Sequence, residues 1–299
     1  MAGSSEGEFA AVSVSGETQV LGLFNKASGA SVYDRVVAVG GGLGEPAPLA
    51  APTGDMVYLE STDVCDSGLY RLAGRGGDAQ PLIDPREAVQ AFALNGTGSR
   101  IAVIRYAECG TQSAAIVVEY DAASGAEVRQ WKLEGIERAV PTRIAWHPAD
   151  RTVAIVRDSP SGTPDRVDLY ELVNGQLTNP RLVTGLPACI NGGLAHVRFA
   201  ADALFIGQDC LDPETAAKRG YIHRVEIDGT KPAVTTVATT PIGTAIAGLD
   251  TTDDGTIVYT TVRWLEQDYE GPTTAYLISA GEKPRKLWES KDRLLGLAW

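Results

Sequence analysis

The chain has 299 residues, of which 44% are hydrophobic, and it carries a formal net charge of −12 with a pI near 4.8. This acidic balance argues against a nucleic-acid partner and against a polybasic contact with a membrane, and it favours solubility. No apolar run approaches the roughly 18 residues that a membrane-spanning helix needs, so we expect no membrane segment in this chain.

The first residues, Met1–Gly7, are small and acidic, and they lack the basic and apolar regions of a secretory signal peptide. We expect them to form a flexible N-terminal lead-in, followed by a single domain over residues 8–299. If the protein is exported, we expect its targeting segment to lie outside this sequence.

A repeated unit organises the chain. In its clearest copy, Thr142–Arg157 (TRIAWHPADRTVAIVR), an apolar strand reaches Trp146, a polar turn follows, and a second apolar strand runs over residues 152–156. Recurrence at about 50 residues is typical of a propeller or a solenoid. The other copies are Pro48–Glu60, which is weaker, and Ala91–Arg105, His196–Gln208 and Gly248–Thr261.

A second signal is a turn rich in Gly, Asn and Asp between two β-rich runs, which is typical of a β-hairpin. Successive glycines of these turns are 47, 49, 50, 54 and 52 residues apart. Six such turns predict six blades, each a four-stranded antiparallel sheet. The glycines are Gly29, Gly76, Gly125, Gly175, Gly229 and Gly281.

The two ends of the chain complete the pattern. Leu294–Trp299 (LLGLAW) matches the first strand of a blade, and Glu6–Ser15 (EGEFAAVSVS) matches the turn and second strand that should follow. The sequence therefore predicts an all-β, six-bladed β-propeller that is closed by N- and C-terminal strands in one blade, because such closure protects the sheet edges. The alternative is that Leu294–Trp299 forms a frayed tail.

Four cysteines allow three pairings. In the blade register, Cys65 and Cys109 fall in loops between the second and third strands of adjacent blades. Cys189 falls in a connection between blades, and Cys210 falls in such a loop of the blade that the connection enters. All four then lie on one face, here called the loop face, and the favoured pairs are Cys65–Cys109 and Cys189–Cys210. The alternatives are four free thiols or a metal site, although a zinc site would normally show a close pair of cysteines.

Persistent disulfides form in oxidising compartments. The cysteines therefore predict an extracytoplasmic protein, either secreted or displayed on the outer side of the cell membrane.

The loop face also carries the longest and most polar loops. Five of them, residues 61–68, 106–114, 157–166, 208–220 and 262–273, hold eleven acidic and five basic residues, which is half of the net charge. Long loops on a rigid scaffold tend to hold binding residues, and Trp and Tyr often anchor interfaces. The predicted binding residues are Asp209, Asp212, Trp264, Glu266, Asp268 and Tyr269.

Metal sites are weighed as alternatives. The acids within residues 63–66 and 266–270 are too sparse for a dedicated Ca²⁺ loop. Glu87, Asn191 and Asp292 stand at the starts of innermost strands, at the mouth of the axial channel. Such a ring resembles the divalent-metal site of lactonase-like six-bladed propellers, which implies a metal-dependent hydrolase with Ca²⁺; the favoured interpretation has no cofactor.

Catalytic motifs of other kinds are missing from the sequence. His147, His196 and His223 fall on different strands and turns and do not fit a triad, and there is neither a G-x-S-x-G nor an H-E-x-x-H motif.

The turns Trp146-His-Pro-Ala-Asp150 and Leu249-Asp-Thr-Thr-Asp-Asp-Gly255 resemble the Pro-Asp-Gly turn of WD40-like, TolB-like β-propeller repeats. Residues 52–55, 95–98 and 200–203 depart from that pattern, so the resemblance supports the fold rather than an activity. It implies a domain that binds proteins or acts as a sensor outside the cytoplasm.

The sequence thus predicts a non-catalytic extracytoplasmic binding or sensor domain that holds a protein or a small ligand at its acidic, disulfide-tied loop face. The lactonase-like hydrolase is the main alternative, and a purely architectural spacer is the third.

Overall fold

The structure is a computed structural model, and it describes the chain in segments separated by short gaps. The described residues are 7–15, 18–39, 42–43, 47–48, 55–63, 65–72, 78–106, 115–131, 133, 140–158, 165–189, 192–200, 202–212, 214–215, 217–228, 232–252, 254–265, 268–279 and 281–299.

Nearly all regular structure in these segments is β-strand, as the alternating and continuous apolar runs predict. One short 3₁₀ helix, η1 (Pro85–Glu87), follows the Asp84 side chain, which accepts a hydrogen bond from the Arg86 amide. No helix among the described residues has the length and apolar character that crossing a membrane would require.

The strands pair into antiparallel sheets that follow the order of the chain. The first comprises β25 (Arg293–Ala298), β1 (Glu8–Ser15), β2 (Thr18–Asn25) and β3 (Ser31–Val39). The next comprises β6 (Met56–Asp63), β7 (Asp66–Leu72) and β8 (Ala79–Ile83), with the short β4 (Gly42–Leu43) and β5 (Ala47–Pro48) both on β6. Then come β9 (Val89–Leu94), β10 (Arg100–Tyr106), β11 (Ala115–Asp121) and β12 (Glu127–Trp131).

The second half of the chain repeats the arrangement. One sheet comprises β13 (Val140–Trp146), β14 (Thr152–Asp158), β15 (Arg166–Val173) and β16 (Gln176–Leu182). An eight-stranded sheet comprises β17 (Gly193–Ala200), β18 (Ala203–Leu211), β19 (Lys218–Glu226), β20 (Ala233–Thr239), β21 (Thr244–Thr251), β22 (Ile257–Leu265), β23 (Asp268–Ile278) and β24 (Arg285–Ser290). Its two halves are joined through a parallel pairing of Arg219 with Thr244.

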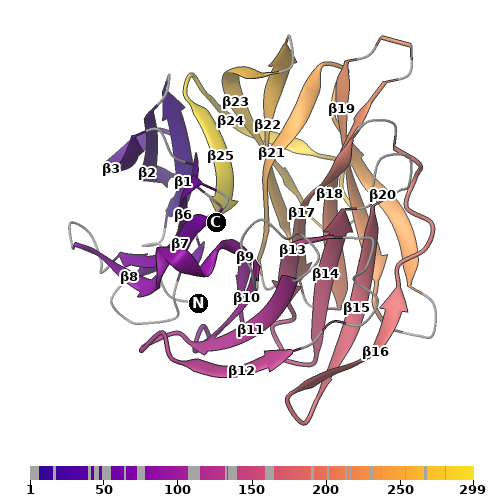
Figure 1. Cartoon of the computed structure of the whole chain (residues 1–299). Helices are drawn as coiled ribbons and strands as arrows, with labels where there is room; N and C mark the ends of the chain where they lie inside the picture. Colours follow the sequence, from indigo (N-terminus) through magenta and orange to yellow (C-terminus); the bar gives the residue numbers. More distant parts are fainter. Residues whose placement is uncertain are drawn as a thin grey trace.

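The two ends of the chain share one sheet, as the sequence predicts. β25 runs antiparallel to β1, with Leu295 opposite Val12 and Leu294 opposite Ser13. The rings of Phe9 and Trp299 stack with their centroids 5.3 Å apart. In Figure 1 the sheets stand side by side around a common centre in chain order, which is the arrangement of a β-propeller.

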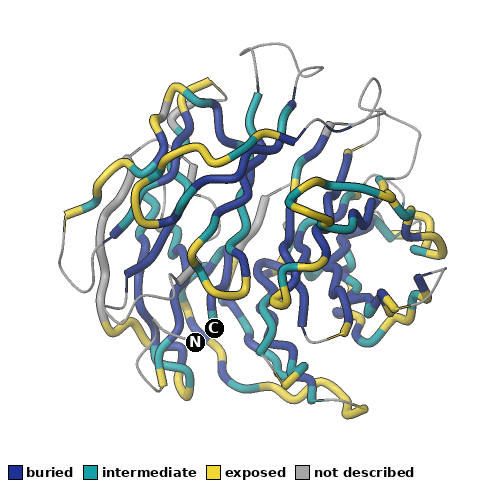
Figure 2. Tube along the Cα trace, turned by 90° about the horizontal axis from the view of Figure 1, so that it is seen from below, coloured by how far each residue is buried: buried dark blue, intermediate teal, exposed yellow. Residues whose placement is uncertain are grey.

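In the second half of the chain, burial is greatest on the second strand of each four-strand unit. Every residue of β14 before Asp158 is buried, and so is every residue of β18 before Leu211, whereas the outer strand β16 has no buried residue. Figure 2 shows the same gradient, with buried segments inside and exposed segments at the outer strands and turns. The second strands are continuous apolar runs because both of their faces pack against neighbouring sheets.

Apolar clusters join each sheet to the next. Val156 and Leu169, for example, pack against Val197 and Leu204 of the following sheet. Each fully buried aliphatic side chain of this size contributes roughly 1.5–3 kcal/mol relative to exposure. The edges are also tied, because the Trp131 indole N–H donates to the Gly175 carbonyl of the neighbouring hairpin at 2.7 Å.

Antiparallel topology gives the molecule two distinct faces. The turns between first and second strands and between third and fourth strands emerge on one of them, here called the turn face. The loops between second and third strands, and the connections between sheets, emerge on the opposite loop face.

Candidate functional site

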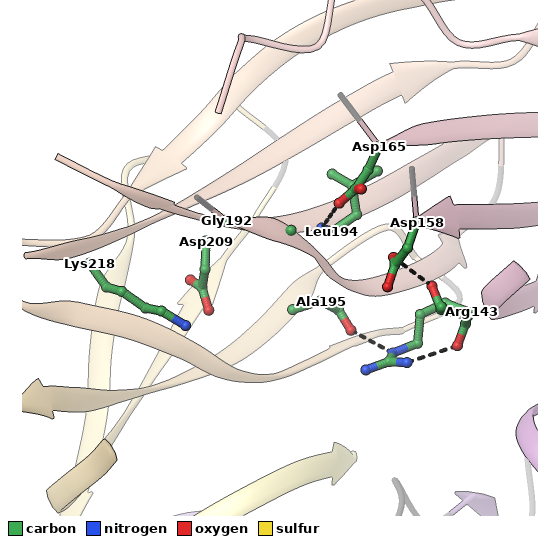
Figure 3. Close-up of a pocket in the computed structure, with 10 residues that line it drawn as sticks. Arg143, Asp158, Asp165, Gly192, Leu194, Ala195, Asp209 and Lys218 are labelled. Atoms are coloured by element: carbon green, nitrogen blue, oxygen red, sulfur yellow. Dashed lines mark hydrogen bonds between the residues drawn. The ribbon is translucent and has the colours of Figure 1, made fainter. Parts of the chain in front are cut away.

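A pocket of about 340 Å³ opens on the loop face, where the sheet β13–β16 meets the strands β17–β19. This volume lies at the lower end of the range for small-molecule sites, roughly 300–1,000 Å³. Its polar lining comes from both sheets, and Figure 3 shows Asp209 and Lys218 on one side and Asp158, Asp165 and Arg143 on the other.

Strand register brings these side chains to one end of the sheets. Asp158 is the last residue of β14, and Asp165 directly precedes β15. Asp209 lies near the end of β18, opposite Gly193 of β17 and Gly220 of β19. All of these positions lie at the loop-face ends of their strands, so three carboxylates from two sheets line one pocket.

Asp209 is the most unusual residue of the pocket, because its side chain is only 3% exposed. Its Oδ1 accepts a hydrogen bond of 3.0 Å from the Ile246 amide, whereas its Oδ2 is buried and has no hydrogen-bond partner. Burial raises the pKa of the Asp209 carboxyl, against the opposing effects of the Ile246 hydrogen bond and of the charges on His196 and Lys218. An unsatisfied buried polar group typically costs about 1–3 kcal/mol.

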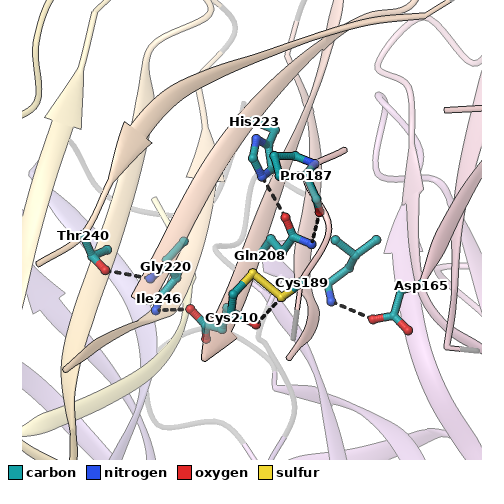
Figure 4. Close-up of a disulfide and its surroundings, with 11 residues drawn as sticks. Asp165, Pro187, Cys189, Gln208, Cys210, Gly220, His223, Thr240 and Ile246 are labelled. Carbon is teal, nitrogen blue, oxygen red and sulfur yellow. Dashed lines mark hydrogen bonds between the residues drawn. A yellow bond between two sulfur atoms is a disulfide. The ribbon is translucent and has the colours of Figure 1, made fainter. Parts of the chain in front are cut away.

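The disulfide Cys189–Cys210 fixes the backbone beside Asp209. The two Cα atoms are 5.1 Å apart, and the Cys189 sulfur lies 3.2 Å from the Asp209 carbonyl oxygen (Figure 4). Gly192 passes so close that a Cβ there would lie 1.9 Å from the same oxygen. The chain therefore needs glycine at position 192 to bring the pocket wall against Asp209.

The carboxylates on the other side have ordinary partners. Asp158 accepts a hydrogen bond of 2.9 Å from the Thr142 hydroxyl, and Asp165 accepts one of 3.1 Å from the Leu194 amide. Asp158 is exposed and Asp165 is half-buried. These two acids add negative charge to the pocket in more solvated positions than that of Asp209.

The two basic residues of the pocket are engaged with other groups. The Arg143 guanidinium donates from Nε to the Ala195 carbonyl at 3.0 Å and from Nη1 to the Thr142 carbonyl at 2.8 Å. The Lys218 ammonium lies over the Trp264 ring, 3.7 Å from its centroid, which is a cation–π contact. Among the described lining residues, three acids against two bases give a formal charge of −1.

A series of hydrogen-bonded neutral groups lies beside the disulfide and links β19 and β18 to the segment before Cys189. Fully buried His223 contacts the Gln208 amide oxygen through Nε2 at 3.0 Å and the Thr236 hydroxyl through Nδ1 at 3.1 Å. Gln208 in turn donates to the Pro187 carbonyl at 3.4 Å. Burial lowers the pKa of His223 to about 4, so this imidazole is neutral at pH 7.

The predicted binding residues have different surroundings. Asp209 lies in the pocket, and Trp264 contacts its Lys218. Asp212 closes its own turn, because its Oδ1 accepts hydrogen bonds from the amides of Glu214 and Thr215 and from the Thr215 hydroxyl.

The other three predicted binding residues belong to the loop between β22 and β23. Asp268 and Tyr269 begin β23, opposite Leu265 and Trp264, and only their backbone is described. Glu266 lies outside the described residues. The pocket acids Asp158 and Asp165 were not singled out by the sequence, and the one signal for them was their place at strand ends on the loop face.

The residues of the alternative metal site are only partly described by the structure. Glu87 pairs with Arg105, Asp292 follows β24, and Asn191 lies outside the described residues. No group of three His, Cys, Asp or Glu side chains in that part is placed to share a metal ion. The lactonase-like alternative therefore stays a prediction.

The cysteine predictions are supported as far as the described residues reach. Cys189–Cys210 is a disulfide, as predicted. Cys65 is also disulfide-bonded, whereas its predicted partner Cys109 lies outside the described residues.

Comparison with known proteins places the fold. No protein-family model matches the chain, and no curated protein matches it in sequence. The crystal structure of TolB from Acinetobacter baumannii is similar with a TM-score of 0.64 and 12% identity, over 98% of this chain and 65% of that one. This chain thus spans slightly less than two thirds of the Acinetobacter protein.

Other solved structures are similar over more of their own length. The putative TolB from Agrobacterium tumefaciens has a TM-score of 0.61 and 11% identity, over 97% of this chain and 91% of that one. An oligogalacturonate lyase from Vibrio parahaemolyticus has a TM-score of 0.54 and 11% identity, over 94% and 79%. At these identities the similarity shows a TolB-like β-propeller fold and no particular activity.

Proposed function

We propose that this protein is a non-catalytic binding or sensor domain that works outside the cytoplasm and holds its ligand on the acidic, disulfide-tied loop face. The observation that carries the proposal is the pocket beside Cys189–Cys210, where a buried carboxylate is oriented by one hydrogen bond and keeps a second oxygen without a partner. A fixed, desolvated polar group at a concave site is typical of a binding pocket.

The proposal includes a complete ring of six blades over residues 8–299. The eight-stranded sheet then counts as two blades, β17–β20 and β21–β24, because a single parallel residue pair links its halves. Apolar clusters between consecutive units support this count, including those that join the β25–β1 sheet to β22–β24 and to β6–β7. A ring of this kind keeps the loop face rigid enough to hold a preformed pocket.

Disulfide bonding supports the extracytoplasmic location, because thiols are kept reduced in the cytosol. To test it, the protein would be isolated from its own cells with acid quenching, alkylated without reduction, and weighed by mass spectrometry. We expect no alkylated cysteine. Four alkylated cysteines would contradict the location while leaving the pocket in place.

Binding itself can be tested by amide NMR with a panel of small positively charged, neutral and negatively charged compounds and short peptides. We expect at least one class to shift the amides of Leu194 and Ile246, which donate to the pocket carboxylates. Asp202→Asn serves as a control variant, because it removes an exposed acid in a turn on the opposite face. It should give the same amide shifts as the unmodified protein. A pocket that responds to no class of compound would overturn the proposed function.

A further inference from the structure

We propose, on the basis of the binding function above, that the pocket takes an organic cation and places its ammonium or guanidinium group against Asp209 Oδ2. The argument rests on the net negative charge of the described lining residues, on the fixed position of that oxygen, and on the spacing of the acids.

The described residues that line the pocket carry a net negative formal charge. Arg143 directs two of its nitrogens to backbone carbonyls, and Lys218 lies on the Trp264 ring. Asp158 and Asp165 add two carboxylates opposite Asp209 (Figure 3). Among these described residues, an anionic ligand would face three acids and only two bases, whereas a cation would offset the net negative charge.

The position of Asp209 is set before any ligand arrives. One carboxylate oxygen is held by the Ile246 amide, and the neighbouring Cys210 is cross-linked to Cys189. Gly220 also leaves room for this carboxylate, since a Cβ there would lie 3.0 Å from Asp209 Oδ1. In its ionised form the carboxylate only accepts hydrogen bonds, so Oδ2 then requires a donor, and a charged donor both forms the stronger bond and favours that form.

The spacing of the acids favours an organic cation over a metal ion. Ca²⁺ requires six to eight oxygens within about 2.3–2.6 Å, and no three acidic, histidine or cysteine side chains in the described part of the chain are grouped for one ion. An ammonium or guanidinium group with a carbon stem needs one carboxylate at its charged end, and a pocket of about 340 Å³ has room for such a stem.

The same chemistry can come from a free amine or from a lysine or arginine side chain of a peptide. Titration calorimetry at low salt would therefore compare n-butylamine and n-butylguanidine with acetyl-lysine amide and acetyl-arginine amide. n-Butanol, butyrate and CaCl₂ serve as the neutral, anionic and metal probes. Tighter binding of the amino-acid amides would identify a peptide as the source, and tighter binding of the free amines would identify a small molecule.

We expect the cations to bind at least tenfold more tightly than n-butanol and butyrate, and Asp209→Asn to weaken cation binding at least tenfold. Asp165→Asn, a half-buried acid on the other side, should weaken binding less, and Asp202→Asn should bind as the unmodified protein does. Equal or tighter binding of n-butanol, butyrate or CaCl₂ would overturn the cation proposal and leave the binding function standing. The absence of binding by every probe class, in calorimetry and in the NMR panel, would remove both.

Discussion

Aspartate serves opposite purposes on the two faces of the molecule. On the turn face, Asp121 accepts hydrogen bonds from the Ala123 and Ser124 amides and from the Ser124 hydroxyl. The Ser124 side-chain bond, followed by the Ser124 amide bond, lowers the pKa of this partly exposed carboxyl. On the loop face, Asp209 is buried with one oxygen unpartnered, and its pKa is raised.

This contrast distinguishes an aspartate that stabilises its own turn from an aspartate that is buried with one oxygen unpartnered. The turn-face acid stabilises the hairpin that contains it, in the manner of an Asx turn. Asp209 closes no turn of its own, and its one hydrogen bond, from the Ile246 amide, together with the disulfide holds it in place. Such arrangements concentrate at functional sites, where local stability is given up for preorganisation.

A buried aspartate that has partners provides the largest expected effect. Asp168 lies behind the loop face, 1% exposed, and pairs with Arg157 at 2.8 Å and with Arg166 at 2.6 Å. Asp168→Asn leaves Arg157 buried without its counter-charge, so we expect a loss of about 3–5 kcal/mol in the free energy of unfolding by urea. A loss below about 1 kcal/mol would mean that burial, rather than pairing, decides what an aspartate does here.

Removing the disulfide should have the next-largest effect on the free energy of unfolding. Cys189 and Cys210 are 21 residues apart, and closing a loop of that size stabilises the folded state by about 3 kcal/mol in the chain-entropy model. We expect Cys189→Ala with Cys210→Ala to lower the unfolding free energy by this amount. In hydrogen exchange, amide protection should fall in 188–189, 192–194 and 207–211 and stay unchanged in the turn-face hairpin 121–126. Equal loosening of both faces would contradict a local role.

Acid should weaken the support of the pocket through His223. Its folded pKa of about 4 lies below the unfolded value of about 6.5, so the neutral form is favoured in the fold. This contribution is complete above pH 6.5 and is lost as the pH falls toward 4, by about 2 kcal/mol. In urea unfolding at several pH values, we expect His223→Gln to reduce the change of unfolding free energy between pH 6.5 and pH 4. An unchanged slope would show that other groups cause the acid sensitivity.

On the turn face, removing a side chain that stabilises a turn should cause a small loss of stability that does not depend on pH. Asn25 Oδ1 accepts hydrogen bonds from the Ala27 amide at 2.9 Å and the Ser28 amide at 3.1 Å. Asn25→Ala should cost about 1 kcal/mol, because a neutral hydrogen bond contributes roughly that much net stability. Thermal unfolding at pH 5 and pH 8 should give the same loss, and a difference between the two would argue against a purely local turn.

The elements that the sequence predicts best depend on short-range patterns. The predicted repeat copy Ala91–Arg105 corresponds to β9 (Val89–Leu94) and β10 (Arg100–Tyr106), and the pairing Cys189–Cys210 follows from the blade register. Asp212 is a different case, because its bonds to Thr215 give an Asx turn that the order Asp-Pro-Glu-Thr signals locally. The sequence nevertheless predicts Asp212 as a binding residue, because it lies in a long acidic loop.

The pocket could not be predicted in the same way, because it depends on contacts between sheets. Asp158 and Asp209 are separated in sequence by the three strands β15, β16 and β17, and they share a pocket because β13 and β17 lie against each other. The unpartnered oxygen of Asp209 is also invisible to the sequence, since it results from the placement of Ile246 on a strand of the next unit.

Asp209→Asn tests the comparison between the two faces most directly. Its expected effect on the unfolding free energy is smaller than those of the other variants, and it is stabilising, whereas Asp168→Asn is destabilising. Asparagine can still accept the Ile246 hydrogen bond, while the charge is gone. Because the folded pKa of Asp209 is raised, its penalty is absent below the ordinary unfolded pKa of about 3.9 and grows as the pH rises toward the folded value.

The stability of Asp209→Asn relative to the unmodified protein should therefore increase between pH 4 and pH 8 in parallel urea titrations. His196 and Lys218 face the same carboxylate and favour its charged form, so the same titration in a Lys218→Met background should show a steeper increase. A relative stability that falls with pH would mean that charged Asp209 stabilises the fold, which would place it with Asp168 as a structural residue and remove the reason to see the loop face as a site.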